Sequence, residues 1–460
     1  MAQAGSAFPF FVRGISAGLL LTVVLAQPSG GRQGVQAYPH RYPYPPPGTG
    51  LTLGWSFLDS LTTRLTDVAV DPGHAVIVCG NRSTGALIRK LGAFSGNTVW
   101  TVHLGGVRAE ELVVDEEGAS YVAGSYSAGG FPDVFLAKID AGGTLAWSYT
   151  YDEYNNNDEG LDVALGPDDS VVVTGHANGL QGANFFTAKL SRSGDVLWTR
   201  QIDGGPDSIV DSAVAVAVDH QGGVLVTGTS EGQASLFTPD VVTVKYSPGG
   251  VLLWTQRHDG TAQSHDSPRD IAATGDGGCV VVGTVENSNS SADPLVLRYG
   301  PDGDLLWLFD KGTNNGDSAR AVVLDSAGNI YVTGSTFTSK NGFDVLVLRL
   351  RPDGLRDWQL RWDGGEGRGD GGHAIALDSH GRVLVAAHSY HWWTENDVTT
   401  LVVDAQQGKV LASAFFDGLQ SRHDTPLAIA ADPGGGFFLA GYANGAYPFE
   451  DALVLRYDYY

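Results

Sequence analysis

One aromatic and histidine-rich stretch, residues 388–395, holds the side chains best suited to binding chemistry. It reads His-Ser-Tyr-His-Trp-Trp-Thr-Glu, where the equivalent stretches elsewhere in the chain are mostly polar. Exposed aromatic faces stack on sugar rings or on the apolar groups of a protein partner. We therefore predict a ligand-binding loop formed by His388, Tyr390, His391, Trp392 and Trp393. The alternative is that Trp392 or Trp393 folds inward and fills the space beside Ala412.

The same stretch also suggests a metal site. Imidazoles are common ligands of transition metals, and His388 and His391 could converge with His373 from a preceding loop. Lone histidines in loops are more often solvated, so the spacing alone leaves both interpretations open.

A second unusual loop, residues 151–158, is rich in oxygen ligands. Asp152, Asn156 and Asp158 carry groups that suit calcium, although the loop lacks the alternating acidic order and the glycine of an EF-hand. We expect no cofactor, and calcium is the one alternative that the sequence suggests. Tyr151 and Tyr154 in this loop are further candidates for ligand binding.

Aspartates recur at two fixed places in the chain. One series precedes a short β-rich segment and comprises Asp158, Asp211, Asp266, Asp317, Asp370 and Asp424. These carboxylates could form a cation-attracting ring, but identical placement in six units favours a structural role, in which each bonds nearby backbone amides. A second series opens another strand-like segment, at Asp133, Asp240, Asp293, Asp344, Asp397 and Asp451, and a basic residue usually follows five positions later. For that series we expect ion pairs between neighbouring units.

Catalytic signatures are missing from this sequence. No Ser-His-Asp or Cys-His arrangement has a recognisable local motif, so we expect no enzyme activity. The two cysteines, Cys79 and Cys279, lie four units apart beside Val-rich segments and are expected to be buried separately, without a disulfide.

The elements that would position these residues form a repeat. A Gly-x-x-x-Trp segment ends at Trp100, Trp147, Trp198, Trp254, Trp307 and Trp358, and Gly408 to Ala412 keeps the spacing without the tryptophan. Each unit of roughly 45 to 56 residues predicts four short strands joined by tight turns, which is typical of a β-propeller blade. Candidate sites should lie on the rim that carries the longer loops.

Counting strands predicts how the ring closes. The first two strands of the unit occur eight times, whereas the tryptophan strand follows only seven of them. The missing strand is supplied by residues 53–57, which carry Trp55. We therefore predict an all-β, eight-bladed propeller of four-stranded antiparallel blades, with the N-terminal strand around Trp55 completing the last blade and protecting its edge.

Two resemblances support this fold. Residues 325–335 and 344–354 resemble the SBBP-type beta-propeller repeat of secreted bacterial proteins. The Gly-x-x-x-Trp segments are similar to the tryptophan-docking repeats of eight-bladed quinoproteins and of an outer-membrane assembly lipoprotein with the same fold. These resemblances imply a propeller over Trp55 to Tyr457 and hardly any particular activity. Quinoproteins use an adjacent Cys-Cys pair at the cofactor, which this sequence lacks.

Composition restricts partners and location. The net charge of −23 disfavours nucleic acid and anionic membranes. Residues 1–26 read as a signal peptide, because the apolar run of about twelve residues after Arg13 is too short for a membrane span. Residues 27–50 form a Pro-, Gly- and Tyr-rich linker, and residues 51–460 form the propeller. We expect a secreted or periplasmic monomer with no membrane span in the mature chain.

The favoured function is a binding or interaction module that holds a protein or a carbohydrate on the long-loop rim. The alternatives are a quinoprotein-like oxidoreductase, a hydrolase or lyase that uses histidines at the central mouth, and a periplasmic scaffold for membrane-protein assembly. No cysteine follows the signal-like run at once, which weakens the lipoprotein comparison.

Overall fold

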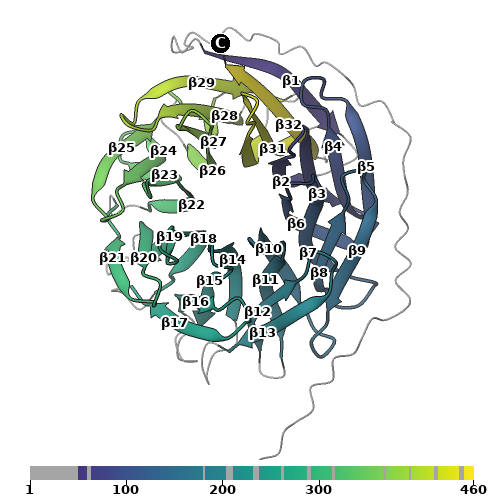
Figure 1. Ribbon diagram of the computed structural model, residues 1–460. Coiled ribbons are helices and arrows are strands. Elements are labelled where there is room, and N and C mark those ends of the chain that lie inside the picture. The colour runs from purple at the N-terminus through teal and green to yellow at the C-terminus, as the bar shows by residue number, and fades with distance from the viewer. Residues whose placement is uncertain are drawn as a thin grey trace, which may run out of the picture.

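The computed structural model describes residues 50–59, 64–179, 182–203, 211–231, 238–260, 264–286, 292–312, 316–365, 369–392, 395–418, 423–444 and 450–459. These residues form eight four-stranded antiparallel sheets arranged as blades around a central axis (Figure 1). The predicted eight-bladed, all-β propeller is confirmed. The proposed signal peptide and nearly all of the proposed linker lie outside the described residues and stay predictions.

Each blade is a meander of consecutive strands, apart from the last. Blades one and two contain β2 (Arg64–Val70), β3 (Val76–Arg82), β4 (Gly85–Leu91), β5 (Thr98–Gly105), β6 (Val107–Val114), β7 (Ser120–Tyr126), β8 (Asp133–Ile139) and β9 (Leu145–Tyr151). Blades three and four contain β10 (Glu159–Leu165), β11 (Val171–Asn178), β12 (Ala183–Leu190), β13 (Val196–Ile202), β14 (Asp211–Val218), β15 (Val224–Glu231), β16 (Pro239–Tyr246) and β17 (Leu252–His258). Blades five and six contain β18 (Ser267–Ala273), β19 (Cys279–Glu286), β20 (Ala292–Tyr299), β21 (Leu305–Phe309), β22 (Ser318–Leu324), β23 (Ile330–Thr338), β24 (Gly342–Leu350) and β25 (Arg356–Trp362). Blade seven contains β26 (Gly371–Leu377), β27 (Arg382–His391), β28 (Glu395–Asp404) and β29 (Val410–Phe416), and blade eight contains β30 (Thr425–Ala431), β31 (Phe437–Asn444), β32 (Glu450–Tyr459) and β1 (Leu51–Asp59).

The tight turns follow the predicted chemistry. In blade six, Oδ1 of Asp325 accepts hydrogen bonds from the backbone N–H groups of Ala327 (3.0 Å) and Asn329 (2.9 Å). Gly328 closes this turn at a φ of 78°, a conformation that residues with a Cβ rarely adopt. The apolar third strand that follows, β24, is buried over most of its length because neighbouring blades cover both faces.

The ring closes as the strand count predicts. β1 pairs antiparallel with β32, with Leu53 opposite Tyr457 and Phe57 opposite Val454. This pairing covers an otherwise open sheet edge in the last blade, where the two ends of the described chain meet (Figure 1).

Each docking tryptophan ties its blade to the next one. Trp254 donates its indole N–H to the carbonyl oxygen of Pro301 at 2.9 Å, in the turn between the third and fourth strands of the following blade. The ring lies against Gly303, where a Cβ would approach Trp254 to 2.8 Å, so glycine is required there. The indoles of Trp55, Trp100, Trp147, Trp198, Trp307 and Trp358 donate in the same way.

This contact explains why blade seven carries Ala412 instead of tryptophan. The tryptophan needs a turn between the third and fourth strands of the next blade. In blade eight those strands are β32 and β1, which no turn connects. Ala412 is 4% exposed and packs instead in a cluster that includes Leu51 and Leu53 of β1.

The hydrophobic core is divided among the blade junctions. Each cluster joins apolar side chains from adjacent sheets, as in the cluster of Val282, Val332 and Leu348 between blades five and six. Cys79 and Cys279 are both buried and unbonded to each other, in blades one and five. Among the described residues there is no helix long and apolar enough to cross a membrane.

Candidate functional site

The predicted long-loop rim is held together by the repeated aspartates that precede each first strand. The backbone N–H of Asp370 donates to the carbonyl oxygen of Phe343 in blade six (2.8 Å). Its carboxylate accepts the N–H groups of Gly364 (2.6 Å) and of Tyr390 in blade seven (3.0 Å). Asp370 thus joins the hairpin of one blade, the connector and the second strand of the next blade.

The same geometry recurs around the rim. Asp158, Asp266 and Asp424 also accept two backbone N–H groups each, one from the connector and one from the end of the second strand of the next blade. Asp317 accepts the backbone N–H of Phe337 at 2.7 Å. These are the contacts that the structural interpretation of the series requires.

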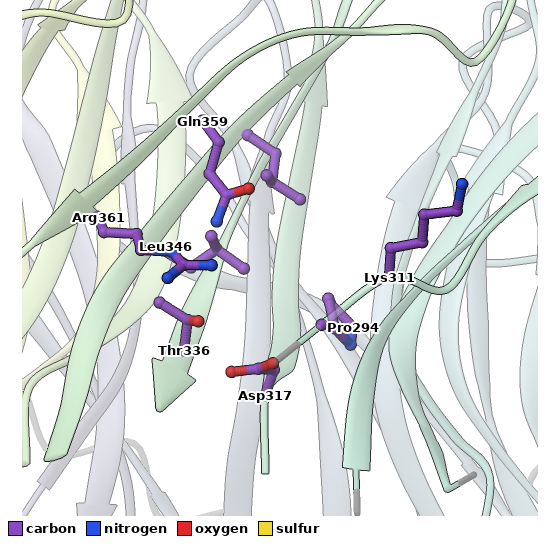
Figure 2. Close-up of a pocket in the computed structure, with 9 residues that line it drawn as sticks. Pro294, Lys311, Asp317, Thr336, Leu346, Gln359 and Arg361 are labelled. Carbon is purple, nitrogen blue, oxygen red and sulfur yellow. The ribbon is translucent and has the colours of Figure 1, made fainter. Parts of the chain in front are cut away.

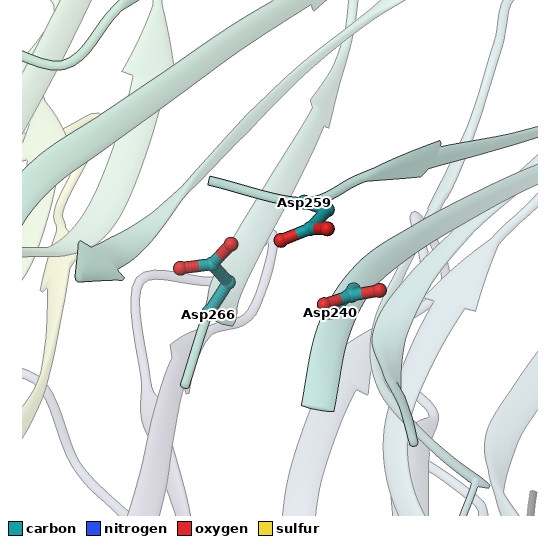
Figure 3. A group of neighbouring side chains, drawn as sticks. All are labelled: Asp240, Asp259 and Asp266. Atoms are coloured by element: carbon teal, nitrogen blue, oxygen red, sulfur yellow. The ribbon is translucent and has the colours of Figure 1, made fainter. Parts of the chain in front are cut away.

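At three junctions the pinned aspartate lies in a group of three carboxylates. Asp240 begins the third strand of blade four, Asp259 follows its fourth strand, and Asp266 precedes blade five (Figure 3). One oxygen from each residue lies within 4.8 Å of the others. The equivalent groups are Asp344, Asp363 and Asp370 between blades six and seven, and Asp397, Asp417 and Asp424 between blades seven and eight. The two predicted aspartate series therefore meet.

Burial and mutual repulsion disfavour the charged forms of these carboxyls. Burial raises the pKa of Asp370 to about 6, with a further contribution from the charge of Asp363. Burial also raises the pKa of Asp424 to about 7, and Asp397 and Asp417 add to the shift. The pKa of Asp344 is raised by burial first and by Asp363 second.

The groups differ in their nearest cation. Between blades four and five, Arg257 Nε lies 2.5 Å from Asp240 Oδ2. Between blades seven and eight, His391 Nδ1 lies 2.9 Å from Asp397 Oδ2. Arg361 occupies the place of Arg257 in blade six, three residues after the docking tryptophan, but forms no ion pair with Asp344 in the described part of the chain.

Arg361 lines a small cleft between blades five and six (Figure 2). The cleft, open to solvent, encloses ≈ 200 Å³. Lys311 and Asp317 line it from blade five and its connector, and Thr336, Gln359 and Arg361 line it from blade six. This space is small for a drug-sized organic ligand.

The bases of the third strands do not pair from blade to blade as predicted. Most of them pair inside their own blade with the aspartate of the first tight turn, whereas Arg349 pairs with Asp357 on the fourth strand of its blade. Lys245 Nζ lies 2.9 Å from Asp219 Oδ2, and Arg298 lies 2.6 Å from Asp276 Oδ2. The long side chains reach along the sheet toward the short-turn rim, so the third-strand aspartates are left at the opposite rim.

The aromatic stretch of blade seven forms the end of a long hairpin. β27 and β28 have ten residues each and stay paired out to His391 opposite Glu395. Trp392 at the tip is 56% exposed, so the alternative in which it fills space beside Ala412 is wrong. Tyr390 is half-buried, and Trp393 lies outside the described residues.

The structure brings together two of the three predicted metal-binding histidines. Nε2 of His373 lies 2.7 Å from Nδ1 of His388, and an Arg320 guanidinium nitrogen lies 3.1 Å from Nδ1 of His373. Because arginine can only donate, His373 carries its proton on Nε2 and donates it to His388. Burial and neighbouring charges lower the pKa of both histidines, that of His388 to about 4. His391 is turned away toward Asp397 and Phe415.

The loop of blade two is closed by its own polar groups. Asp152 accepts the backbone N–H of Asn155 at 2.7 Å, while Asp158 is buried in its pinning role. Tyr154 is 60% exposed. Tyr151 packs on Phe186 with ring centroids 4.6 Å apart and donates its hydroxyl to Glu153. Burial raises the pKa of Asp158 to about 7, with smaller contributions from the charges of Asp152 and Asp133, and the suggested calcium site stays a prediction.

Sequence reasoning missed a set of acids on the innermost strands. Asp67, Glu111, Asp162 and Asp270 each follow a β-bulge in the first strand of a blade. Asp162 accepts the N–H of Val216 in the next blade at 2.7 Å. Burial raises the pKa of Asp67 to about 6 and of Asp162 to about 7. These buried acids could have been predicted from the sequence, because each is an acidic residue inside a mainly apolar first strand.

A second missed feature is a set of exposed leucines on the outer strands. Leu197, Leu253 and Leu306 are more than half exposed, on the fourth strands of blades three, four and five. Each of these leucines directly precedes a docking tryptophan, so the Gly-x-x-x-Trp segments could have predicted their position on the outer strands.

Part of the chain matches a known repeat family, and about half of it is similar in sequence to two curated proteins. Residues 310–337 match the family model of the SBBP beta-propeller repeat, and the expected resemblance is confirmed for this segment. FlaEY, a regulatory protein of Caulobacter vibrioides, is 28% identical over 275 residues, which cover 55% of this chain and 26% of that protein. An uncharacterized WD repeat-containing protein, L264 of Acanthamoeba polyphaga mimivirus, is 23% identical over 273 residues, which cover 49% of this chain and 18% of that protein. The chain spans less than a third of the length of either relative.

Among solved structures, BamB from Moraxella catarrhalis superposes with a TM-score of 0.50 at 13% identity, covering 89% of this chain and 99% of BamB. This likeness concerns the fold and is compatible with the quinoprotein-like resemblance of the docking repeats.

Proposed function

We propose that the chain is a secreted β-propeller that acts as an interaction module, with a protein partner bound on the long-loop rim. The observation that carries the proposal is the asymmetry of blade seven. Its central hairpin has ten residues in each strand and presents Trp392, which is 56% exposed, at its tip. A buried aromatic anchor is the commonest energetic centre of a protein interface.

Three further observations support binding rather than chemistry. The hairpin is rigidly based, since Tyr390 N–H is held by Asp370 and Glu395 lies 3.1 Å from His423 of the next connector. The imidazoles of His373 and His388 are hydrogen-bonded to each other, and His373 is also bonded to Arg320, so both are engaged within the protein. Propeller relatives include WD-repeat and BamB proteins, and in this fold activity is decided by loops, not by the blades.

Site-specific photo-crosslinking tests the proposal. A photoreactive amino acid is placed at Trp392, at Tyr154 on the same rim, and at Leu253 on the outer face, and each protein is exposed to the secreted fraction of the producing cells. We expect a discrete crosslinked protein at position 392 that unlabelled wild-type chain displaces and a Trp392→Ala chain does not. Crosslinking confined to position 253 would contradict binding at the long-loop rim and would indicate that the partner binds the exposed leucines of the outer strands.

Carbohydrate is the second candidate ligand, because a solvent-facing indole also stacks on sugar rings. A glycan array probed with wild-type and Trp392→Ala chains separates the two. Binding on the array that the substitution abolishes, without any crosslinked protein, would identify a sugar-binding module.

A further inference from the structure

The carboxylates between blades six and seven form no ion pair within the described residues, although the charge of Arg361 partly offsets the raised pKa of Asp344. Asp344, Asp363 and Asp370 each place one oxygen within 4.8 Å of the others. Asp344 and Asp370 are 4% and 2% exposed, and Asp363 is half-buried. Neither lysine nor arginine forms an ion pair with any of the three in the part of the chain that the structure describes.

An orphaned oxygen points to a ligand. Oδ1 of Asp344 is buried and accepts no hydrogen bond within the described residues, although the Thr338 hydroxyl reaches this carboxyl and lowers its pKa. A buried carboxylate oxygen normally has a partner, since leaving it without one costs free energy. The hydroxyl of Ser389, also fully buried, lies beside Asp370. Oxygens from both blades therefore converge at this junction.

We propose that this group, Asp344, Asp363 and Asp370, binds a calcium ion that bridges blades six and seven. Calcium takes oxygen ligands at about 2.3–2.6 Å, so two oxygens on one ion are at most about 5 Å apart, and one oxygen from each of the three residues lies within that reach. Magnesium binds at about 2.0–2.1 Å, demands octahedral geometry and usually uses only one or two carboxylates.

The backbone contacts are compatible with this role. Asp370 accepts the N–H groups of Gly364 and Tyr390, and Asp363 accepts the N–H of Gly365 at 2.9 Å. Each carboxylate oxygen has two lone pairs, so these bonds fix the direction of the carboxylates and leave acceptor capacity for a cation. Asp344 comes from blade six and Asp370 from the start of blade seven, so the ion would tie the two sheets together.

The proposal is independent of the interaction partner, and isothermal titration calorimetry of the full mature chain tests it. The chain is first treated with EDTA and desalted, and then titrated with calcium or magnesium. We expect calcium binding in preference to magnesium, with a rise in Tm. Asp363→Asn, which keeps the shape and removes a charge, should weaken calcium binding by about tenfold or more. The matched control is Asp259→Asn between blades four and five, which should leave this binding unchanged.

Terbium, a luminescent calcium substitute, locates the ion. Trp362 directly precedes Asp363 and can sensitise terbium bound there. Trp362→Phe should remove most of the sensitised luminescence while the calcium affinity measured by calorimetry is retained. A Tm of Asp363→Asn in EDTA that equals or exceeds the wild-type value would exclude misfolding as the cause of a loss. Lack of calcium binding at millimolar concentration, or equal effects of Asp363→Asn and Asp259→Asn, would overturn the proposal.

Discussion

The junction between blades four and five and the junction between blades six and seven carry the same three aspartates, yet they differ in charge balance. At the first, Arg257 lies 2.5 Å from Asp240 and neutralises one carboxylate. At the second, the equivalent Arg361 lines the neighbouring cleft and Oδ1 of Asp344 has no hydrogen-bond donor among the described residues. The two junctions therefore differ in whether the equivalent arginine forms an ion pair with the carboxylate group, since Arg361 acts on Asp344 through its charge without such a pair.

The two junctions share the backbone contacts made by the aspartate that precedes the first strand. Asp266 accepts the N–H groups of Gly260 and Glu286, and Asp370 accepts those of Gly364 and Tyr390. Both also donate their own N–H to the hairpin of the preceding blade. At both junctions, one aspartate therefore joins two blades, whatever else binds there.

The largest effect should come from removing the aspartate whose carboxylate accepts these backbone N–H groups. Asp370→Ala and Asp266→Ala should each lower the free energy of unfolding by about 3 kcal/mol, because two buried backbone N–H groups lose a charged acceptor. Urea denaturation followed by tryptophan fluorescence measures the loss, with Asp353→Ala in an exposed tight turn as the control. If either variant unfolded at the wild-type urea concentration, the pinning role would be wrong at that junction.

The features that the junctions share could be predicted from sequence because they repeat along the chain. Tight turns, the Trp55 strand and the aspartates before each first strand follow local rules of turn chemistry and strand pairing. The closure by β1 followed from a count of strands. Even the loss of tryptophan at Ala412 has a topological reason, since blade eight lacks the turn on which the indole would dock.

The difference in ion pairing between the two junctions could not be predicted, because it depends on side-chain conformation. Arg257 and Arg361 stand in equivalent positions of the repeat, and sequence gives no sign that only one contacts its aspartate. The meeting of the two aspartate series was also missed, since strand spacing alone did not place the start of a third strand beside the next connector. His391 was expected beside His388 but is directed to Asp397, because residues an odd number of positions apart on a strand face opposite sides.

Converting the closed junction into an open one should have the next largest effect. Arg257→Gln leaves Asp240, 7% exposed, without its guanidinium, so we expect the calcium-free chain to lose about 1–2 kcal/mol of stability. Calcium should restore it, and calorimetry should count one more bound ion than in the wild type. An unchanged ion count would mean that the guanidinium is not what distinguishes the two junctions.

The reverse change at the open junction should have a smaller effect of opposite sign. Asp344→Asn removes one of three mutually repelling carboxylates, so in EDTA the variant should be more stable than wild type by roughly 0.5–1 kcal/mol. In millimolar calcium it should be less stable, because the ion loses a ligand. Thermal unfolding in both buffers measures this crossing. A variant that is less stable in both buffers would show that Asp344 has only a structural role.

The smallest effect is the dependence on pH. Burial and the charge of Asp363 raise the pKa of Asp370 to about 6, above that of an unfolded aspartate near 3.9. Without calcium, the folded chain retains a proton between about pH 6 and 4 that the unfolded chain releases, so this residue makes folding more favourable as the pH falls through that window. Calcium needs the ionised carboxyl, so its affinity should fall by about fourfold between pH 7.5 and 5.5. The dependence should disappear together with the binding in Asp363→Asn, whereas Asp259→Asn should retain it. A calcium affinity that stayed constant across this range would place the ion away from Asp370.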